Sequence, residues 1–525
     1  MSRSGEAGPS APPMGEDEIE IGLGASPSGR MEAPERWRDP VSPYQAAPVL
    51  GAPKTSRKYA RERPIIPSDT RSDAERMADI HATIDAYKRR MEERSRHHMG
   101  YPYNLDFDCA VLEPLMRYLC VNMGDPLNGD GPHGLNSNEF EVGVLDFFAD
   151  LWHIPRDAYW GYVTDAGTEG NLFGIGLGRA NFERGVLYAS AASHYSVFKA
   201  ARMYRIDTVE VPELEGGEID YAALDAALRA NLGRPAIVNV NLGTTVRGAV
   251  DDLDRVLGIL AGAGYPEGSF HVHCDGALFG MMAPFMEAPG AGGGRGAPVV
   301  SFEKPIGSVS VSGHKFLGSP VPCGVVLTRR SLVEALSTEV EWLGGGDPTV
   351  MGSRNGHAAV WLWVALARKG RAGIRADVLR CVRNARTLRG MLAAAGVPAS
   401  LNELSNTVVF ERPGEEFVRR WQLACEGPIA HAVVMPNVGL GTMEAFVREL
   451  VASRARASAE AARRVGEAAR EAEEEERRAA AAARGAERGP GPAASGVGGG
   501  SGGVQKGQAA STAAAAAAGP AAAAC

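Results

Sequence analysis

The sequence has no long hydrophobic run, no secretory signal and no closely paired cysteines. No stretch approaches the about 20 apolar residues that span a bilayer. The first residues, MSRSGEAGPSAPPMGEDEIEIG, have no apolar core and carry early acids that disfavour a transit peptide. The seven cysteines lie far apart, at positions 109, 120, 274, 323, 381, 425 and 525, with neither a zinc-type pair nor an apparent disulfide framework. These absences favour a cytoplasmic protein without a membrane partner.

An excess of positive charge is also missing. The chain of 525 residues has 55 basic and 63 acidic residues, a net charge of −8 and no polybasic block, which disfavours a nucleic-acid partner. Its apolar share of 45% and charged share of 22% are typical of a globular protein. The 65 glycines and 33 prolines exceed the usual combined share of about 12%, so we expect flexible segments beside a normal core.

Composition divides the chain into four segments. Residues 1–70 are rich in Pro, Gly and Ser, which predicts a disordered N-terminal extension. Residues 71–330 are expected to hold an N-terminal segment and a large domain, and residues 331–452 a small C-terminal domain. Residues 453–525 begin with Ala, Arg and Glu and end in Ala and Gly, which predicts a charged helix followed by a disordered tail.

An amphipathic helix is predicted where order begins. Ser72 followed by Glu75 has the pattern of a helical capping box. Apolar residues then recur at helical spacing, at Met77, Ile80, Ile84, Tyr87 and Met91. Such a stripe is typical of packing, either within the chain or against a partner subunit.

Apolar, β-rich runs alternate with helical stretches through the predicted large domain. We predict short buried strands at GVLYAS, AIVNVNLG, SFHVHCDGA, SVSVSG and CGVVLT. Helices that close in Gly are predicted for YAALDAALRANLG and LDRVLGILAGAG. This alternation predicts an α/β fold with a mostly parallel, doubly wound sheet. A smaller α+β domain is predicted from NTVVFERP and IAHAVVMP, which follow a helical stretch through 358–395.

A lysine follows one of these predicted strands. In Ser310-Val-Ser-Gly-His-Lys315 the amine comes after an apolar run and a turn of small residues, although lysine is costly to bury. One interpretation is an exposed loop lysine. The other is an amine desolvated enough to form a Schiff base with a carbonyl cofactor.

A carboxylate ends a second predicted strand. In His271-Val-His273-Cys274-Asp275, strand alternation places His271, His273 and Asp275 on one face. These are metal-ligand types, but no preformed fourth ligand lies nearby in the sequence, so we expect no metal site. Pyridoxal phosphate needs an ionised acid beside its pyridine nitrogen, to keep the ring an electron sink. Asp275 suits that role.

A glycine-rich turn and a histidine complete the pattern. The segment from Tyr162 to Asn171, YVTDAGTEGN, predicts a strand that turns into a helix, and the free N–H groups at such a helix start suit a phosphate. A plain helix cap is the alternative. His194 follows GVLYAS and is either a hydrogen-bonded core residue or a flat ring stacked on a cofactor at the strand ends. With Lys315 and Asp275, these features predict a pyridoxal-phosphate site.

The sequence resembles the group II pyridoxal-phosphate-dependent amino-acid decarboxylases, which have fold type I. Within that group it is most similar to plant serine decarboxylases and next to bacterial histidine decarboxylases. The likeness is carried by GYPYNLDFD, FEVGVLDFFADLW, GTEGN, YASAASHYSVFKAARMYR, NVNLGTTVRGAVDDLD, HCDGALFGMMAPF, SVSGHKFLGSP, MGSRNGH, LNELSNTVVFERP, FVRRWQLACEG and HAVVMPNV. It covers the predicted folded body and neither tail.

The resemblance implies a cofactor role for each matching residue. Lys315 would hold pyridoxal 5'-phosphate as a Schiff base, and Asp275 would pair with its pyridine nitrogen. His194 would stack on one face of the ring, and Ala277 would pack against the other. The phosphate would be surrounded by Gly167, Thr168, Ser312 and His314.

The resemblance also implies residues around the substrate. Thr244 and Thr245 would lie near the ring edge, or would only form a turn at a strand end. The substrate would meet His194, Tyr101 and Tyr103, although aromatic side chains there also suit plain packing. The loop 352–357, with Arg354 as its substrate-binding residue, would approach the site of a partner subunit, or would be an ordinary polar turn.

The implied reaction is decarboxylation of L-serine to ethanolamine and CO₂, by way of an external aldimine and a quinonoid. Lys315, His194 and Asp275 would be the catalytic residues. Histidine decarboxylation to histamine is the alternative, because the GYP and SGHK-type motifs are shared by both groups. A catalytically idle paralogue that only binds the cofactor is a third possibility. Family members are dimers with active sites at the interface, so the expected partners are an amino-acid substrate and a second copy of the chain.

The phosphate turn departs from the family pattern at Asp165-Ala166, where Asn and a small residue or Cys are expected. A carboxylate facing the phosphate would repel it, so we expect the Asp165 side chain to point away. For the same reason, the expected contact of Glu169 with the anion is through its backbone and not through its carboxylate.

Overall fold

The structure, a computed structural model, describes residues 66, 71–129, 133–286 and 296–487. The chain divides into two units, Met1–Lys88 and Arg89–Cys525. The disorder predicted for residues 1–70, except at Ile66, and for the end of the chain after 487 lies outside the described residues. The division of the folded body at 330 and 452 stays a prediction.

Helix α2 (Asp73–Arg96) begins with the predicted capping box. The Ser72 N–H donates to Glu75 Oε2 at 2.8 Å, and the Glu75 N–H donates back to Ser72 Oγ at 3.3 Å. Two N–H groups at the helix start are thereby satisfied, and the predicted start of this helix is confirmed. The apolar stripe predicted along it is exposed, at Met77, Ile80, Ile84, Tyr87 and Met91.

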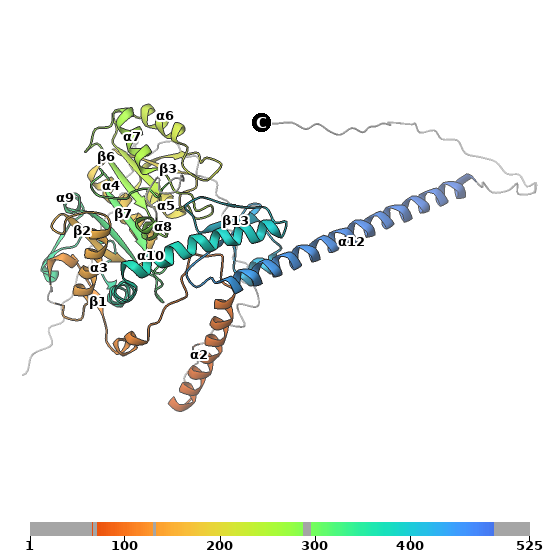
Figure 1. The fold of residues 1–525 in the computed structure, drawn as a ribbon, viewed down its shortest axis with the longest axis horizontal. Coiled ribbons are helices and arrows are strands. Elements are labelled where there is room, and N and C mark those ends of the chain that lie inside the picture. Colours follow the sequence, from red (N-terminus) through yellow and green to blue (C-terminus); the bar gives the residue numbers. More distant parts are fainter. Residues whose placement is uncertain (1–65, 67–70, 130–132, 287–295, 488–525) are drawn as a thin grey trace, which may run out of the picture. The chain divides into compact units, whose positions relative to one another are not determined.

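A seven-stranded sheet lies in the second unit (Figure 1). Its strands are β2 (Tyr159–Thr164), β3 (Val186–Ser190), β4 (Asp207–Val211), β5 (Ala236–Asn241), β6 (Phe270–Asp275), β7 (Ser308–Ser312) and β8 (Gly324–Arg329). Their order is β2-β8-β7-β6-β5-β3-β4, in which only β8 runs antiparallel to its neighbours. The five strands predicted in the large domain are β3 and β5 to β8. The mostly parallel sheet confirms the predicted α/β fold class.

Helices cover both faces of this sheet, as the doubly wound prediction requires. Helices α4 (Gly167–Asn181) and α5 (Tyr195–Tyr204) pack on one face, where Leu172, Val197 and Ile237 share a hydrophobic cluster. Helices α3 (Asn138–Leu151), α6 (Tyr221–Ala230) and α7 (Leu253–Ala263) contribute to the main core cluster on the other face, which includes Val238 and Cys274. Strands β2, β3, β5 and β7 are buried along their whole length, as strands covered on both faces are.

Local capping explains where α6 and α7 begin and end. Asp220 accepts the N–H groups of Ala222 and Ala223 at the start of α6, and Asp252 accepts the Arg255 N–H at the start of α7. Helix α7 ends at Gly264, whose φ of 97° is left-handed, as the closing glycine predicts. Helix α6 ends earlier than its glycine, with Asn231 as its C-cap.

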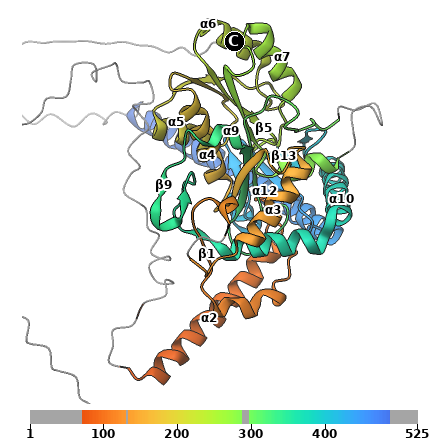
Figure 2. The same cartoon turned by 90° about the vertical axis from the view of Figure 1, so that its left-hand side faces the viewer.

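A second, four-stranded sheet follows along the chain and is antiparallel throughout. Its strands are β12 (Ala399–Leu401), β13 (Thr407–Glu411), β14 (Ala424–Glu426) and β15 (Ile429–Val433), in the order β12-β13-β15-β14. Helices α10 (Gly356–Ala394) and α11 (Glu415–Trp421) accompany it, and α10 is kinked at Gly370, where φ is 57°. Helix α10 also packs against α3 (Figure 2). This part has the predicted α+β character.

The remaining elements are short, apart from the last helix. They are η2 (Ala110–Arg117), β1 (Val121–Asn122), η3 (Pro126–Asn128), α8 (Phe279–Met282), η4 (Ala283–Phe285), α9 (Arg330–Val333), β9 (Glu339–Val340), η5 (Glu341–Leu343), β10 (Gly345–Gly346) and β11 (Arg354–Asn355). Helix α12 (Leu440–Glu487) includes the predicted charged segment, and its residues 455–481 are exposed. Of the helices in the described ranges, none combines the length and the hydropathy needed to cross a membrane.

Candidate active site

Strand direction gathers most of the predicted residues at one edge of the large sheet. Strands β2, β3, β5, β6 and β7 point the same way, so their carboxyl ends meet there. Asp275 is the last residue of β6, and Ser312 is the last residue of β7. Gly167 and His194 follow β2 and β3, at the first turns of α4 and α5. Lys315 lies in the turn after β7.

The Lys315 side chain is partly buried in that turn and is not an exposed loop lysine. Desolvation lowers the pKa of its amine, and the nearby Asp275 carboxylate opposes this shift. The turn is held from outside, because the Asn104 N–H donates to the Lys315 carbonyl at 2.9 Å and Asn104 Nδ2 donates to the Phe316 carbonyl at 3.0 Å. A lowered pKa favours the neutral, nucleophilic form of the amine.

His194 lies within electrostatic range of both charged groups. Burial lowers the pKa of its imidazole, the Asp275 carboxylate raises it and the Lys315 ammonium lowers it. Its Nδ1 lies 2.7 Å from Ser196 Oγ and also accepts the Ser196 N–H at 3.4 Å. Among the described residues, Nε2 of His194 has no hydrogen-bond partner. The structure therefore brings an amine, a carboxylate and an imidazole together from three strand ends.

Asp275 is buried, and both of its carboxylate oxygens are hydrogen-bonded. Asn171 Nδ2 donates to Oδ2 at 2.7 Å, and the Ala277 N–H donates to Oδ1 at 3.2 Å. His273, considered as a metal-ligand type in the sequence, instead hydrogen-bonds Asn171 and Ser308. The described residues contain no group of three or more His, Cys, Asp and Glu side chains placed to hold a metal ion.

Asn171 is a site residue that sequence reasoning missed. It appeared only as the last letter of the glycine-rich turn, without a role. In the structure its amide contacts both Asp275 and Ser196, the hydrogen-bond partner of His194. The signal available in the sequence was its position four residues after Gly167, on the same face of a helix that starts at the site.

The start of α4 forms a small cradle with β7. The Gly167 N–H donates to Ser312 Oγ at 3.1 Å, and the Ser312 N–H donates to the Ala277 carbonyl at 2.9 Å. A Cβ added at Gly167 would lie 2.6 Å from Ser312 Oγ and 3.2 Å from the Ala277 Cβ, so only glycine fits here. Among the described residues, the N–H groups of Thr168 and Glu169 have no hydrogen-bond partner, and they remain available to an anion.

The two acids of this turn lie in different environments, and the direction of the Asp165 side chain relative to a phosphate stays a prediction. The Asp165 side chain is exposed. The Glu169 carboxylate is buried and accepts the Asp165 N–H at 2.6 Å and the Tyr162 hydroxyl at 3.0 Å. Burial raises the pKa of Glu169, and these two hydrogen bonds oppose the shift. The carboxylate of Glu169 therefore braces the turn, and its backbone remains at the helix start.

Aromatic rings form a row that leads to the lysine turn. Tyr101 and Tyr103 stack with centroids 6.0 Å apart, and Tyr103 lies 5.8 Å from the ring of His314. His98 stacks on Tyr103 at 5.4 Å. His314 Nδ1 is held by the backbone of Cys323, 3.2 Å from its N and 2.9 Å from its O. The two tyrosines are thus both packed and partly exposed beside Lys315.

Thr244 is used by the turn after β5. Its Oγ1 accepts the Ala249 N–H at 3.0 Å, and its own N–H donates to the Ala249 carbonyl at 2.8 Å. Thr245 is exposed. This geometry supports the turn interpretation for Thr244. The placement of either threonine near a ring edge stays a prediction.

Arg354 differs most from its expected role. Its Nη2 lies 2.9 Å from Glu141 Oε2, and its Nη1 donates to the Gly124 carbonyl at 2.8 Å. The pair is almost fully buried, and the guanidinium lies over the Tyr162 ring at 5.3 Å. A substrate contact needs a free guanidinium, whereas this one already has a structural partner. We therefore do not place Arg354 in the substrate site.

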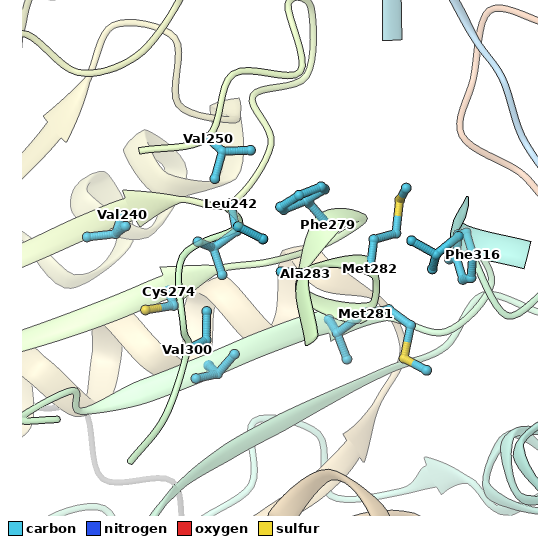
Figure 3. Close-up of a cluster of buried hydrophobic side chains, with 14 of the residues drawn as sticks. Val240, Leu242, Val250, Cys274, Phe279, Met281, Met282, Ala283, Val300 and Phe316 are labelled. Atoms are coloured by element: carbon cyan, nitrogen blue, oxygen red, sulfur yellow. The ribbon is translucent and has the colours of Figure 1, made fainter. Parts of the chain in front are cut away.

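A hydrophobic cluster packs around the chain neighbours of Asp275 and Lys315. Cys274 and Phe316, the chain neighbours of Asp275 and Lys315, belong to the main core cluster (Figure 3). Other members drawn there are Val240, Leu242, Val250, Phe279, Met281, Met282, Ala283 and Val300. Close packing of this kind restricts the positions of the backbone at both strand ends.

A family model described as "Pyridoxal-dependent decarboxylase conserved domain" matches residues 137–409, which include Gly167, His194, Asp275 and Lys315. The chain belongs to the pyridoxal-dependent decarboxylase family. The expected enzyme class, a pyridoxal-phosphate-dependent carboxy-lyase, is thereby confirmed, and so is an amino acid as the class of substrate.

Named relatives of this decarboxylase include plant enzymes. Serine decarboxylase 1 of Oryza sativa subsp. japonica is 52% identical over 415 residues, covering 79% of this chain and 84% of the relative. Serine decarboxylase 2 of the same plant is 48% identical and covers 74% and 81%. Histidine decarboxylase of Solanum lycopersicum is 45% identical and covers 72% and 89%.

Solved structures of decarboxylases share this fold. L-methionine decarboxylase from Streptomyces sp.590 superposes with a TM-score of 0.64 at 25% identity, covering 74% of this chain and 98% of that one. Glutamate decarboxylase from Lactobacillus brevis has a TM-score of 0.60 at 18% identity and covers 74% and 94%, which is a likeness of fold alone. The predicted fold type I architecture is confirmed.

Pyridoxal phosphate, the cofactor of this decarboxylase family, fits the residues present. The site offers a partly desolvated amine at Lys315 and a buried, hydrogen-bonded carboxylate at Asp275. Its cradle at Gly167 excludes even a methyl group, and N–H groups without a partner begin α4 beside it. Each is a group that the cofactor's aldehyde, pyridine nitrogen or phosphate requires.

Proposed function

We propose that the protein is a serine decarboxylase, which converts L-serine to ethanolamine and CO₂. The observation that carries this proposal is the ranking of the relatives: three rice serine decarboxylases, 52%, 48% and 48% identical, stand above a histidine decarboxylase at 45%. The cytoplasmic location favoured by the sequence is part of the proposal and is supported by the spacing of the cysteines and by the composition of the first residues.

Four residues are proposed to hold the cofactor's ring. Lys315 carries it through Nζ, and Asp275 faces its pyridine nitrogen. His194 and Ala277 lie against the two ring faces. Support comes from the lowered pKa of Lys315 and from the effects of Asp275 and Lys315 on the pKa of His194. The hydrogen bond from the Ala277 N–H to Asp275 Oδ1 also supports this arrangement.

The phosphate is proposed to bind at the start of α4. Thr168 offers a backbone N–H group there, Gly167 leaves the space that a side chain would fill, and Ser312, whose Oγ accepts the Gly167 N–H, offers its hydroxyl hydrogen. His314 lies close by in the lysine turn, with its ring held by Cys323. Thr244 and Thr245 stay in the proposal as residues at the ring edge, with Thr244 acting through its turn.

Pyridoxal phosphate, when bound, supplies the electron sink for the pair of electrons left at Cα when CO₂ departs. Asp275 would face the pyridine nitrogen, and burial of this carboxylate would strengthen an electrostatic interaction there. Lys315 Nζ accepts a proton in its neutral form and returns it, because desolvation lowers the pKa of the amine. Neutral His194, whose Nδ1 accepts from Ser196, has a proton on Nε2 to donate, so either group suits protonation of Cα.

The substrate is proposed to enter past Tyr101 and Tyr103. Both rings are partly exposed, and the row they form ends at His314 beside Lys315. Histidine is the second candidate substrate, supported by the tomato histidine decarboxylase at 45% identity. A hydroxymethyl and an imidazole side chain differ strongly in size, so the space beside these tyrosines would discriminate between them.

A homodimer with shared active sites is also proposed. Large apolar side chains of the segment before β1 are exposed in the single chain, at Val111, Met116, Tyr118 and Leu119. Such clusters are typical of protein interfaces. Light scattering is expected to give twice the mass of one chain, and Val111→Glu with Leu119→Glu is expected to reduce both mass and activity. Val465→Glu, at an exposed position of α12, is the control.

An amine assay tests the proposed function. Purified full-length protein with pyridoxal phosphate receives L-serine, L-histidine or L-methionine separately, and the amines are identified by mass spectrometry. Ethanolamine as the main product supports the proposal, whereas histamine would replace the substrate and keep the enzyme class. Lys315→Ala is expected to abolish turnover, and Lys199→Ala, an exposed lysine on α5, is expected to leave it unchanged. Turnover by Lys315→Ala would refute the role of Lys315.

A further inference from the structure

The side-chain amide of Asn171 connects two residues of the proposed site. Its Nδ2 donates to Asp275 Oδ2 at 2.7 Å and to Ser196 Oγ at 2.9 Å. Ser196 Oγ lies 2.7 Å from His194 Nδ1. Asn171 is only 1% exposed, so this path from carboxylate to imidazole runs through the protein interior.

The other end of the amide is held by two donors. Asn171 Oδ1 lies 3.0 Å from His273 Nε2 and 2.9 Å from Ser310 Oγ. The amide cannot be reversed while Asp275 is ionised, because its oxygen would then face a carboxylate oxygen at 2.7 Å. Both donor hydrogens and both acceptor positions of the amide are thereby used.

This orientation determines the proton positions on two buried histidines. Asn171 Oδ1 only accepts, so His273 carries its proton on Nε2; burial lowers the pKa of His273 to about 4, so its Nδ1 is unprotonated. That Nδ1 accepts the Ser308 hydroxyl at 2.8 Å. Ser308 Oγ in turn accepts His271 Nε2–H at 3.0 Å. The three donors of this hydrogen-bonded row, on His271, Ser308 and His273, therefore all point toward Asn171.

The same orientation determines the proton position on His194. Ser196 Oγ accepts from Asn171, so its own hydrogen is free to donate to His194 Nδ1. The Ser196 N–H donates to the same nitrogen at 3.4 Å. Because Nδ1 accepts from both groups, the proton of neutral His194 lies on Nε2.

Three glycines of helix α4 face the buried histidines and serines of this hydrogen-bonded row, the polar chain. A Cβ at Gly174 would lie 2.2 Å from His273 Nδ1, and one at Gly170 would lie 2.6 Å from the Ser310 Cβ. At Gly178 it would lie 3.1 Å from His271 Cδ2. Glycine is a poor helix former, so three glycines at intervals of four residues lower the stability of α4 and leave room for the histidines and serines.

We propose that Asn171 is a positioning residue for the decarboxylation: held by His273 and Ser310, its amide orients the Asp275 carboxylate, and through the Ser196 hydroxyl it helps to keep the proton of His194 on Nε2. The proposal rests on the proposed function, which places Asp275 and His194 against the cofactor. The 2.7 Å hydrogen bond from Asn171 Nδ2 restricts where Oδ2 of Asp275 can lie. Without the amide, Asp275 loses its closest donor, and Ser196 Oγ loses the donor that leaves its own hydrogen to point at His194.

Asn171→Ala in the full chain is the first test. The dissociation constant for pyridoxal phosphate is expected to rise and kcat to fall, each roughly 10-fold to 100-fold, the range typical of residues that orient a ligand's direct contacts. KM for the amino acid is expected to stay within about 2-fold, because Asn171 does not reach the substrate. Ser310→Ala, which removes one of the two donors to Oδ1, is expected to have a smaller effect in the same direction.

Asn181→Ala is the matched control. Asn181 lies on the same helix, and its Nδ2 donates to the carbonyls of Leu177 at 3.0 Å and Leu332 at 2.9 Å, without contact to Asp275. It loses two hydrogen bonds, as a merely structural asparagine would. Its cofactor affinity and kcat are expected to match those of the wild type, and melting temperatures of the cofactor-free variants check that all are folded.

A second measurement needs neither cofactor nor turnover. In cofactor-free protein labelled with ¹⁵N-histidine, nuclear magnetic resonance is expected to show a neutral histidine protonated at Nε2, whose signals disappear in His273→Gln. A His273 protonated at Nδ1 would reverse the amide and overturn the proposal, even if Asn171→Ala failed to fold.

The outcomes separate this proposal from the proposed function. If Asn171→Ala binds the cofactor and turns over like Asn181→Ala, Asn171 is not a positioning residue, and the decarboxylase assignment stands. If the wild-type chain releases no amine from any amino acid while His273 is protonated at Nε2, the polar chain stands and the catalytic proposal fails.

Discussion

The guanidinium of Arg354 and the carboxylate of Glu141 form a buried ion pair that joins β11 to α3. Arg354 Nη2 lies 3.0 Å from Oε1 and 2.9 Å from Oε2 of Glu141. Glu141 also accepts the Val163 N–H at 2.7 Å and Asn122 Nδ2 at 2.5 Å. One carboxylate therefore ties together segments that are far apart in the sequence, including the β2 strand that leads to Gly167.

Removing one partner of this pair is expected to destabilise the fold. Arg354→Ala leaves a buried carboxylate without its counter-charge, which typically costs about 3–5 kcal/mol in the free energy of unfolding. Arg229→Ala, which breaks the exposed pair with Asp225, is the control and is expected to leave the free energy of unfolding nearly unchanged. Urea unfolding of the cofactor-free chain measures both. Equal stability of the two variants would contradict the structural role of Arg354.

Gly167→Ala is expected to weaken cofactor binding. The new methyl group would lie 2.6 Å from Ser312 Oγ, so the cradle at the start of α4 must open. We expect affinity for pyridoxal phosphate to fall at least about 10-fold, which corresponds to about 1.4 kcal/mol. Gly258→Ala on α7, where a Cβ meets nothing within 4 Å, is the control. Unchanged affinity, measured by fluorescence titration, would place the phosphate elsewhere.

The buried histidines predict acid sensitivity. Burial lowers the pKa of His273 to about 4 and that of His271 to about 3, from an ordinary value of 6.5. The unfolded chain therefore binds more protons below pH 6.5, so the stability contributed by neutral histidine is present above that pH. It is lost as the pH falls toward the folded values.

Between pH 6.5 and 5 the free energy of unfolding is expected to fall by about 1–2 kcal/mol for each of these histidines. Urea unfolding of the cofactor-free protein at several pH values measures the slope. His271→Gln is expected to flatten it, and His81→Gln, at an exposed position of α2, is expected to leave it unchanged. The same slope in both variants would show that His271 is not held neutral.

Tyr103 is expected to affect substrate binding more than the chemical step. Tyr103→Ala removes the ring between Tyr101 and His314, so we expect KM for the amino acid to rise roughly 10-fold with a smaller change in kcat. Tyr103→Phe keeps the ring and is expected to restore KM unless the hydroxyl itself contacts the substrate. A loss confined to kcat in Tyr103→Ala would move this residue from the entrance to the reacting atoms.

Much of the fold was readable from the sequence. Strand β6 reads as SFHVHCDGA and ends at Asp275, as predicted, because a strand buried on both faces is short, apolar and bounded by turn residues. Helix α7 begins after Asp252 and ends at Gly264 for reasons of local capping. The ends of α10 and α2 were harder to predict from the sequence. Gly370 kinks α10 without ending it, and α2 continues past its apolar stripe to Arg96.

The candidate site was only partly readable. Asp275 ends a predicted strand and Lys315, His194 and Gly167 each follow one, and parallel strands bring such residues to one edge. Arg354 was placed at the substrate by resemblance, whereas its real partner, Glu141, lies more than 200 residues earlier in the chain. Nothing local in the sequence marks that pair.

The sequence by itself determined the elements, the order of the strands along the chain and the chemical groups at their ends, because hydrophobic periodicity and capping are local properties. Only the tertiary structure decided which polar groups meet. Asn171 comes from one helix, Asp275 and His273 from a strand and Ser196 from another helix, and their hydrogen bonds depend on how α4 packs over the sheet. A buried amide must satisfy its donors and acceptors with whatever the fold places beside it, and that neighbourhood is set by packing over long sequence separations.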